Sequence, residues 1–278
     1  MVNERLPGEV QQAVSVFLAA VDAAAPGLVT GFYLVGSVAL GDFHPTGAGR
    51  GPFSTASDID FVAVLSRRTD ADTAALAGAQ ARVVAERSRP SFDGCCLTEA
   101  ELAAGPDGCP GVPCWQSGRF APAGRFAINP VTFCELARHG VAVRGRQPAE
   151  LDVWHDPAAL RAFTADNLRS YWRPAWRKGR RPGPVRFAVG LTGWYPVWTV
   201  LGVSRLHYTL ATGEMTSKCG AGRYARESFD PRWHRILDES LALRTGGAEG
   251  RRGYRNPLSR RRDTLAYLDA TIDAALAL

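Results

Sequence analysis

The stretch that decides the fold is Ser-Asp-Ile-Asp-Phe-Val-Ala-Val-Leu, residues 57–65. From Ile59 to Leu65 it is apolar and rich in β-branched residues, which predicts a buried β-strand. Alternation along a strand sends the side chains of Asp58 and Asp60 to the same side, while Ile59 points into the core. We therefore expect two carboxylates about 7 Å apart at the start of this strand.

The two carboxylates predict a metal. Like charges at this spacing are costly unless something positive lies between them, and a hard divalent cation such as Mg²⁺ prefers oxygen ligands. An isolated Asp-x-Asp is more often a solvated turn. The prediction of a magnesium site at Asp58 and Asp60 therefore needs a second feature.

A Gly-Ser pair supplies that feature. The apolar run at residues 32–35 predicts a preceding strand that ends at Gly36-Ser37, and a helical stretch follows. Backbone N–H groups and the Ser37 hydroxyl would then be placed to bind a phosphate at the start of a helix. Neither motif is informative alone, but their order, each at the edge of an apolar strand, indicates a metal-nucleotide site.

The rest of the chain divides in two. Apolar spacing predicts helices between residues 7 and 26, at 69–87 and at 131–139, with strands at 92–97 and 141–143. Residues 41–56 predict a mobile loop, and residues 99–130, rich in Gly and Pro, receive no predicted element. Beyond residue 157 the patterns are helical, at 158–172, 185–210, 231–244 and 256–276. We predict an α/β domain with a mixed sheet at 1–155 and an all-α helical-bundle domain at 156–278, with a short linker at 246–253.

Length, charge and cysteines set the broad class. The chain has 278 residues, a net charge of +6 and six scattered cysteines, which we interpret as reduced thiols. No apolar run approaches the roughly 20 residues of a membrane span, and no signal peptide is visible, so we expect a cytoplasmic protein without a membrane partner. Arginine clusters at 177–181 and 251–262 lack aromatic stacking motifs, and we favour solvated surfaces over nucleic-acid binding.

Two groups of residues resemble a known family. The Gly36-Ser37 pair followed by Ser-Asp-Ile-Asp at 57–60 resembles the polymerase-β-like nucleotidyltransferases. The stretches His-Gly-Val-Ala-Val-Arg-Gly at 139–145 and Ser-Arg-Leu-His-Tyr-Thr-Leu-Ala-Thr-Gly-Glu-Met-Thr-Ser-Lys at 204–218 look like the aminoglycoside adenylyltransferases that modify streptomycin and spectinomycin. The resemblance implies a Mg²⁺-dependent transfer of AMP from ATP to a hydroxyl of a small molecule, and with it antibiotic resistance.

The resemblance also implies a nucleotide site. Mg²⁺-ATP would be bound by Gly36, Ser37, Asp58 and Asp60, and the phosphates would be contacted from the helical domain by Arg205 and Lys218. Arg205 lies in an otherwise apolar helix, where a guanidinium needs a partner. A structural ion pair is the alternative for Arg205, and Lys218 falls in a polar turn.

A third carboxylate completes the implied catalytic set. In the family it lies on the next strand, where it ligates metal or accepts the proton of the attacking hydroxyl, and Asp93 matches that position. The adenylyltransferases closest in pattern carry a Glu there, one methylene longer. A capping role for Asp93 is the alternative.

The acceptor site departs from the family. Aminoglycosides are polycations, and the family binds them with acidic side chains at positions that here are Leu191 and Tyr195. Trp115 looks like the family's ring-stacking tryptophan, with a core position as the alternative. Trp194, Tyr195 and Trp198 would line an aromatic pocket suited to a less charged acceptor, although such spacing is more often core. Residues 45–54 form an insertion that we expect to act as a lid.

Two rival functions stay open. The chain could be a nucleotidyltransferase that modifies a protein or tRNA, a role that the basic clusters would fit. It could also be an inactive nucleotide-binding regulatory module. The presence of Ser37, Asp58 and Asp60 together argues against an inactive site, because loss of one metal carboxylate would be the simplest route to inactivity.

Overall fold

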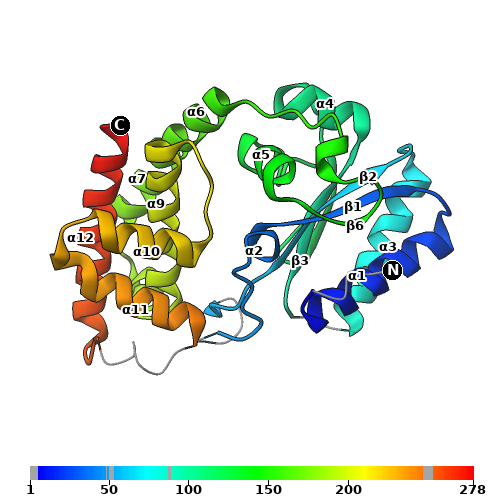
Figure 1. Cartoon of the computed structure of the whole chain (residues 1–278). Coiled ribbons are helices and arrows are strands. Elements are labelled where there is room, and N and C mark those ends of the chain that lie inside the picture. Colours follow the sequence, from blue (N-terminus) through cyan, green and yellow to red (C-terminus); the bar gives the residue numbers. More distant parts are fainter. Residues whose placement is uncertain (1–5, 48, 50–52, 87–88, 247–252) are drawn as a thin grey trace. The chain divides into compact units, whose positions relative to one another are not determined.

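The computed structural model describes residues 6–47, 49, 53–86, 89–246 and 253–278. The chain divides into two compact units, each with its own core. The sheet unit contains Met1–Pro45 and Asp58–Pro157, and the helical unit contains Thr46–Ser57 and Ala158–Leu278. The predicted fold class is confirmed, since a mixed sheet with helices is followed along the chain by an all-helical region (Figure 1).

The sheet unit is built on six strands in the order β5-β4-β3-β2-β1-β6. They are β1 (Val29–Val35), β2 (Ile59–Leu65), β3 (Phe92–Thr98), β4 (Val112–Gln116), β5 (Arg119–Gly124) and β6 (Val141–Arg144). Strands β2 and β3 pair in parallel, and the other neighbours pair antiparallel. A parallel pair needs a crossover, which α3 (Asp70–Glu86) supplies.

Helices cover both faces of this sheet. The first face packs against α1 (Gly8–Ala24) and α3, where Phe17 contacts Phe32, Phe61 and Phe92 at ring-centroid distances of 5.7, 5.5 and 5.5 Å. The opposite face packs against α4 (Glu99–Gly108) and α5 (Pro130–His139) (Figure 1). Alternate residues of one strand therefore enter different cores, as the period-two pattern predicts.

Residues 99–130 contain a helix and two strands that were not predicted, because the segment is rich in Gly and Pro. Helix α4 begins with a capping box, in which the Thr98 side chain accepts from the Glu101 N–H and the Glu101 carboxylate accepts from the Thr98 N–H. Strands β4 and β5 form a hairpin whose turn residues, Ser117 and Gly118, have φ values of 52° and 74°. Two positive φ values suit the right-handed twist of the flanking strands.

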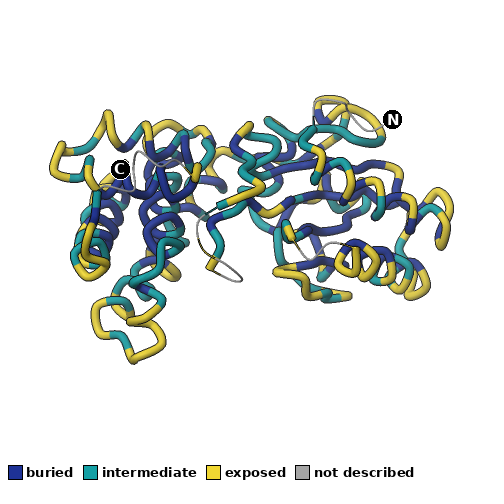
Figure 2. The backbone as a smooth tube through the Cα atoms, turned by 90° about the horizontal axis from the view of Figure 1, so that it is seen from below, coloured by how far each residue is buried: buried dark blue, intermediate teal, exposed yellow. Residues whose placement is uncertain are grey.

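The helical unit is centred on α9 (Trp194–Thr212), whose apolar residues contact most of the neighbouring helices. Around it lie α6 (Pro157–Asn167), the π-helical turn η3 (Leu168–Trp172), α7 (Arg173–Arg180), α8 (Pro184–Gly190), α10 (Lys218–Ser228), η4 (Pro231–Trp233), α11 (His234–Thr245) and α12 (Pro257–Leu276). The predicted helix at 185–210 is divided into α8 and α9 near Gly190 and Gly193, and α10 was not predicted. In both units buried residues line the interior and exposed residues lie on outward helix faces and loops (Figure 2).

The segment Thr46–Ser57 belongs to the helical unit although it precedes β2 in sequence. Arg244 of α11 donates to the Thr55 carbonyl at 2.7 Å and to the Ser57 hydroxyl at 2.6 Å. The Thr55 hydroxyl donates in turn to the Leu243 carbonyl at 2.8 Å. Parts of the predicted lid at 45–54 and of the predicted linker at 246–253 lie outside the described residues.

Among the described residues, no helix combines the length and the apolar character that a bilayer crossing requires. All six cysteines are free and buried, in keeping with the prediction of reduced thiols. Burial raises the pKa of the Cys95, Cys96 and Cys109 thiols above the ordinary value, because the thiolate would lose its hydration.

Candidate active site in the sheet unit

The predicted Gly-Ser turn lies at the end of β1. Gly36 has a φ of +64°, and it begins the short helix α2 (Gly36–Ala39). Because α2 has four residues, its dipole is small, and any phosphate binding here would depend on the N–H groups of the turn and the Ser37 hydroxyl. That hydroxyl lies 3.4 Å from the Asp58 carbonyl, to which it donates, so the turn and the Asp-x-Asp motif are adjacent.

Strand β2 brings Asp60 against this turn. Asp60 is paired with Val35, the last residue of β1. A Cβ atom on Gly36 would lie 2.3 Å from Oδ2 of Asp60, well inside van der Waals contact. Gly36 is thus required both by its positive φ and by the close approach of the Asp60 carboxylate.

Strand β3 places a second carboxylate next to Asp60. In the parallel register Asp60 is opposite Asp93, and neighbouring strands lie about 4.8 Å apart. Both residues continue the face that carries Val62 and Cys95, which contributes to the core beneath α4 and α5. Period-two alternation therefore directs both carboxylates to one face, at the end of the strands beside Gly36.

Asp93 is 5% exposed and is held by three donors. The Ser91 hydroxyl donates to Oδ1 at 2.8 Å, the Ser117 N–H to Oδ2 at 2.9 Å and the Gly118 N–H to Oδ1 at 3.3 Å. The carboxylate thus caps the turn between β4 and β5, which is the structural alternative considered from the sequence. Two carboxylate oxygens offer about four acceptor positions, so capping leaves capacity for a further hydrogen bond.

The donor set suits a hard divalent cation. Asp60 and Asp93 are adjacent like charges, and Asp58, which is exposed, immediately precedes β2. A divalent cation would offset the repulsion between the neighbouring carboxylates, and the ligands present are all oxygens. The space that a Cβ atom on Gly36 would fill is taken by Oδ2 of Asp60, which holds this carboxylate against the Gly-Ser turn.

Arg205 and Lys218 lie in the helical unit. The Nε of Arg205, on α9, donates to the Thr216 carbonyl at 3.1 Å, so this partner is a backbone oxygen rather than the carboxylate of the alternative interpretation. Lys218 is the first residue of α10, after the N-cap Ser217. A cation at a helix N-terminus is unfavourable for the helix itself.

Two comparisons with known proteins bear on this geometry. Residues 187–263 match the family model described as aminoglycoside adenylyltransferase, C-terminal domain. This part of the helical unit, which includes Arg205 and Lys218, is similar to the C-terminal domain of that family.

The second comparison is structural. The chain matches the crystal structure of the spectinomycin adenyltransferase AAD(9) from Enterococcus faecialis with ATP and spectinomycin, at 15% sequence identity and a TM-score of 0.61. The match covers 93% of this chain and 98% of that chain, so the two share their fold over nearly their whole length. Comparison with curated protein sequences gave no match. The predicted resemblance to the aminoglycoside adenylyltransferases is confirmed, by the family model over residues 187–263 and by the shared fold.

Trp115 requires a correction. The sequence suggested a ring that stacks on substrate, but the side chain is 0% exposed and lies in the core on the α1 side of the sheet. Its ring centroid is 5.1 Å from that of Phe120, 5.8 Å from Phe61 and 5.9 Å from Phe17. A ring enclosed in this way has no face left for a ligand, so the core alternative holds.

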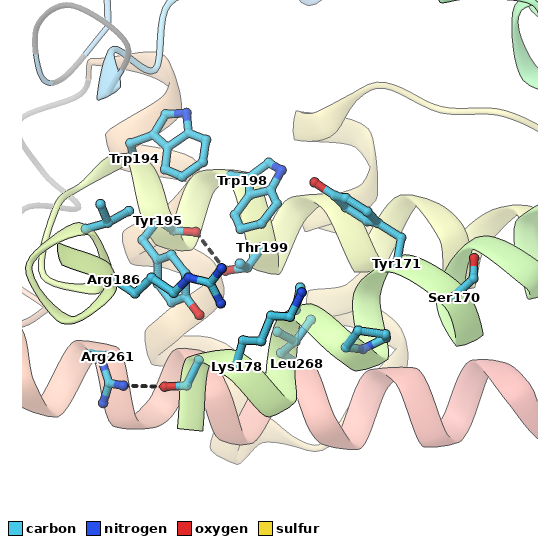
Figure 3. Close-up of a pocket in the computed structure, with 14 residues that line it drawn as sticks. Ser170, Tyr171, Lys178, Arg186, Trp194, Tyr195, Trp198, Thr199, Arg261 and Leu268 are labelled. Carbon is cyan, nitrogen blue, oxygen red and sulfur yellow. Dashed lines mark hydrogen bonds between the residues drawn. The ribbon is translucent and has the colours of Figure 1, made fainter. Parts of the chain in front are cut away.

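Tyr195 lines a cavity of about 370 Å³ within the helical unit (Figure 3). Trp194 and Trp198 line it too. The sequence missed its other polar residues, which are Ser170, Tyr171, Lys178, Arg186, Thr199 and Arg261. The arginine clusters were the available signal, since Lys178 and Arg261 fall inside them. Leu191 is not among the lining residues, and its carbonyl accepts from Arg260 at 2.7 Å.

Proposed function

We propose that this protein is a Mg²⁺-dependent adenylyltransferase that transfers AMP from ATP to a hydroxyl group of a small molecule. The observation that carries the proposal is the pairing of Asp60 with Asp93 beside the Gly36-Ser37 turn. Two adjacent carboxylates next to this turn fit a metal-bound triphosphate, because carboxylates suit the metal and backbone N–H groups of a turn can donate to phosphate oxygens.

Asp58 and Asp60 would hold Mg²⁺, with Asp93 as a further ligand. When bound, the ion would neutralise negative charge on the α-phosphate and on the leaving pyrophosphate. The N–H groups at Gly36 and Ser37 and the Ser37 hydroxyl would donate to the phosphate oxygens. Arg205 and Lys218 of the helical unit would contact the same phosphates, for which Arg205 has guanidinium donors besides its Nε.

The reaction would be an in-line displacement. The acceptor oxygen forms a bond to the α-phosphorus as the bond from that phosphorus to the bridging oxygen breaks, and pyrophosphate leaves. The hydroxyl proton goes to a base, and Asp93 is the carboxylate placed for that role, because it is held by the β4–β5 turn at the same face as Asp60. Its three donors fix the carboxylate in position.

The structural similarity to AAD(9) supports a hydroxylated antibiotic as one acceptor to test. AAD(9) was solved with ATP and spectinomycin, and its printed name describes a spectinomycin adenyltransferase. Resistance to spectinomycin or streptomycin is the corresponding biological proposal. A tRNA acceptor is the rival that the basic clusters suggest.

The proposal is tested by the transfer of label from ATP labelled at the α-phosphate. Streptomycin, spectinomycin, hydroxylated aromatic acids and tRNA would be offered as acceptors to the wild type, to Asp60→Asn and to Asp70→Asn. Asp70 is exposed at the start of α3 in the same unit and serves as the matched control. We expect label on one acceptor with the wild type and the control, and its loss in Asp60→Asn without a loss of thermal stability. Equal transfer by Asp60→Asn would refute the assigned site.

A further inference from the structure

The side chains that line the cavity in the helical unit differ from those expected in a binding site for a polycation. It is lined by 14 residues from the α6–α12 part of the chain, and its volume of about 370 Å³ falls in the range of small-molecule sites. None of those 14 residues is Asp or Glu, while Lys178, Arg186 and Arg261 contribute three positive charges. A ligand with several ammonium groups would meet repulsion here and no carboxylate in the lining. Asp166 is not a lining residue, although its Oδ2 lies 3.4 Å from the Ser170 hydroxyl.

One wall of the cavity is aromatic and flat. Trp194 and Trp198 are stacked, with ring centroids 4.9 Å apart and an interplanar angle of 11°. Trp198 also packs on Trp172 at 5.0 Å, which fixes its orientation from behind. Tyr171 stands edge-on to Trp198 at 6.3 Å and is 49% exposed. Trp194 and Trp172 therefore cover the two faces of the Trp198 ring, and the wall offers a ligand the indole edges and the half-exposed ring of Tyr171.

The cations lie on the other side of the same space. Figure 3 shows the side chains of Lys178 and Arg186 extending beside Trp198 and Tyr195. Arg261 is fixed by a hydrogen bond from Nη2 to the Gly179 carbonyl at 2.5 Å, and its guanidinium lies 5.1 Å from the centre of the Phe187 ring. The nearby acids Asp269 and Asp273 form ion pairs with Arg173, which offsets their negative charge.

The polar groups between these walls are neutral hydroxyls. Tyr195 lines the cavity, and burial raises the pKa of its phenol, so the hydroxyl keeps its proton at neutral pH. The Ser170 hydroxyl donates to the Asp166 carbonyl at 2.8 Å, so its oxygen faces the cavity as an acceptor. Neutral hydroxyls can bond to a ligand hydroxyl without imposing a charge.

We propose that this cavity binds the acceptor, and that the acceptor is a planar aromatic compound that bears an anionic group and a free hydroxyl, rather than a polycationic aminoglycoside. That the ligand is the acceptor rests on the proposed adenylyltransferase function. The chemical class of the ligand is argued from the cavity alone. The aromatic ring would pack against Tyr171 and the indole edges of Trp194 and Trp198, and the anionic group would face Lys178 and Arg186. A nucleotide shares the same chemistry of flat ring and negative charge, and the test separates the two.

The test is calorimetric titration of the full-length protein with three probes: 4-hydroxybenzoate, streptomycin and a non-hydrolysable ATP analogue with Mg²⁺. The variants are Lys178→Met, which keeps the apolar stem, Trp198→Leu, and the control Arg177→Met, an exposed neighbour that does not line the cavity. We expect 4-hydroxybenzoate to bind and streptomycin not to compete. We also expect Lys178→Met and Trp198→Leu each to weaken the binding of 4-hydroxybenzoate about tenfold or more. The affinity of Arg177→Met should equal that of the wild type.

Each outcome decides a separate claim. The inference on ligand class is overturned if streptomycin binds more tightly than 4-hydroxybenzoate. It is also overturned if Lys178→Met leaves the affinity for 4-hydroxybenzoate unchanged. Loss of ATP-analogue binding in the cavity variants, with competition by 4-hydroxybenzoate, would show that the cavity is the nucleotide's. Normal aromatic-acid binding with no nucleotide binding anywhere would count against the proposed function and leave the ligand class standing.

Discussion

Gly36 and Asp60 are in such close approach that a Cβ atom on Gly36 would lie 2.3 Å from Oδ2 of Asp60. The glycine at the end of β1 thus determines where the carboxylate of β2 can lie. Any side chain at this position must displace Asp60 or the turn itself. This relationship links the Gly-Ser motif to the Asp-x-Asp motif, which the sequence could present only as two separate patterns.

Substitution Gly36→Ala should therefore remove adenylyl transfer. Gly41→Ala is a matched control, because Gly41 has a φ of +65° but no atom within 4 Å of an added Cβ. Both variants should lose about 1 kcal/mol of stability from the positive φ, but only Gly36→Ala should lose activity by a large factor. Activities that fall equally in the two variants would show that backbone strain, not the displaced carboxylate, is responsible.

Asp93 is expected to serve both structure and chemistry. Substitution Asp93→Asn replaces an acceptor by an amide that faces three donors, so it should cost about 1–3 kcal/mol of stability and abolish turnover. Ser91→Ala removes one donor and leaves the carboxylate, so it should cost about 1 kcal/mol with turnover largely kept. Steady-state rates and chemical denaturation would be measured on both. A folded Asp93→Asn protein with normal turnover and an unchanged pH profile would leave Asp93 with the capping role alone.

Arg244 should be important for the stability of the helical unit. Its side chain is 2% exposed and donates to Thr55 and Ser57 in the segment that leads directly to Asp58. We expect Arg244→Met to lower the free energy of unfolding by about 3 kcal/mol, because two buried acceptors lose a charged donor. Arg226→Met is the control, since Arg226 is 49% exposed and its pair with Asp238 is worth about 0–1 kcal/mol. Similar unfolding midpoints for the two variants would contradict this assignment.

The buried thiols predict a loss of stability in alkali. Burial raises the pKa of Cys109 from an ordinary value of 9.0 to about 11. The unfolded chain would therefore release this proton first, so the contribution is complete below pH 9 and is lost as the pH rises from 9 towards 11. Urea denaturation at pH 7, 9 and 10 would measure the decline. A free energy of unfolding that rises over this range would contradict the assignment, as would rapid labelling of Cys109 in the folded protein by a thiol reagent at pH 8.

Much of the sheet unit could be predicted from local patterns. Strand β2 is apolar except for Asp60, β3 follows the helix break at Pro90, and α1 and α3 have helical spacing, so each was found close to its observed bounds. The region 99–130 was missed because Gly105, with a φ of +75°, and Pro106 interrupt the helical pattern of α4. The β4–β5 hairpin is short, and its Ser117-Gly118 turn is a weak signal without the partner strands.

The site was predictable only where its residues are close in sequence or follow a repeated motif. Asp58, Asp60 and the Gly36-Ser37 turn were all named in advance. The contact of Asp93 with the 117–118 turn depends on the sheet register, which local spacing does not give. The cavity combines residues of α7, α8, α9 and α12, so only the tertiary structure could show that its aromatic wall and its cations share one space. Trp115 was assigned wrongly, because a motif match does not distinguish a tryptophan that stacks on a ligand from one that is buried in the core.

The most direct test of the central claim is calorimetric titration of the purified protein with a non-hydrolysable ATP analogue, with and without Mg²⁺, for the wild type and Asp60→Asn. We predict one nucleotide bound per chain in the presence of Mg²⁺, and at least about tenfold weaker binding when Mg²⁺ is omitted or Asp60 is replaced. No nucleotide binding by the folded wild type would contradict the account. So would binding that is unchanged by both the removal of Mg²⁺ and the replacement of Asp60.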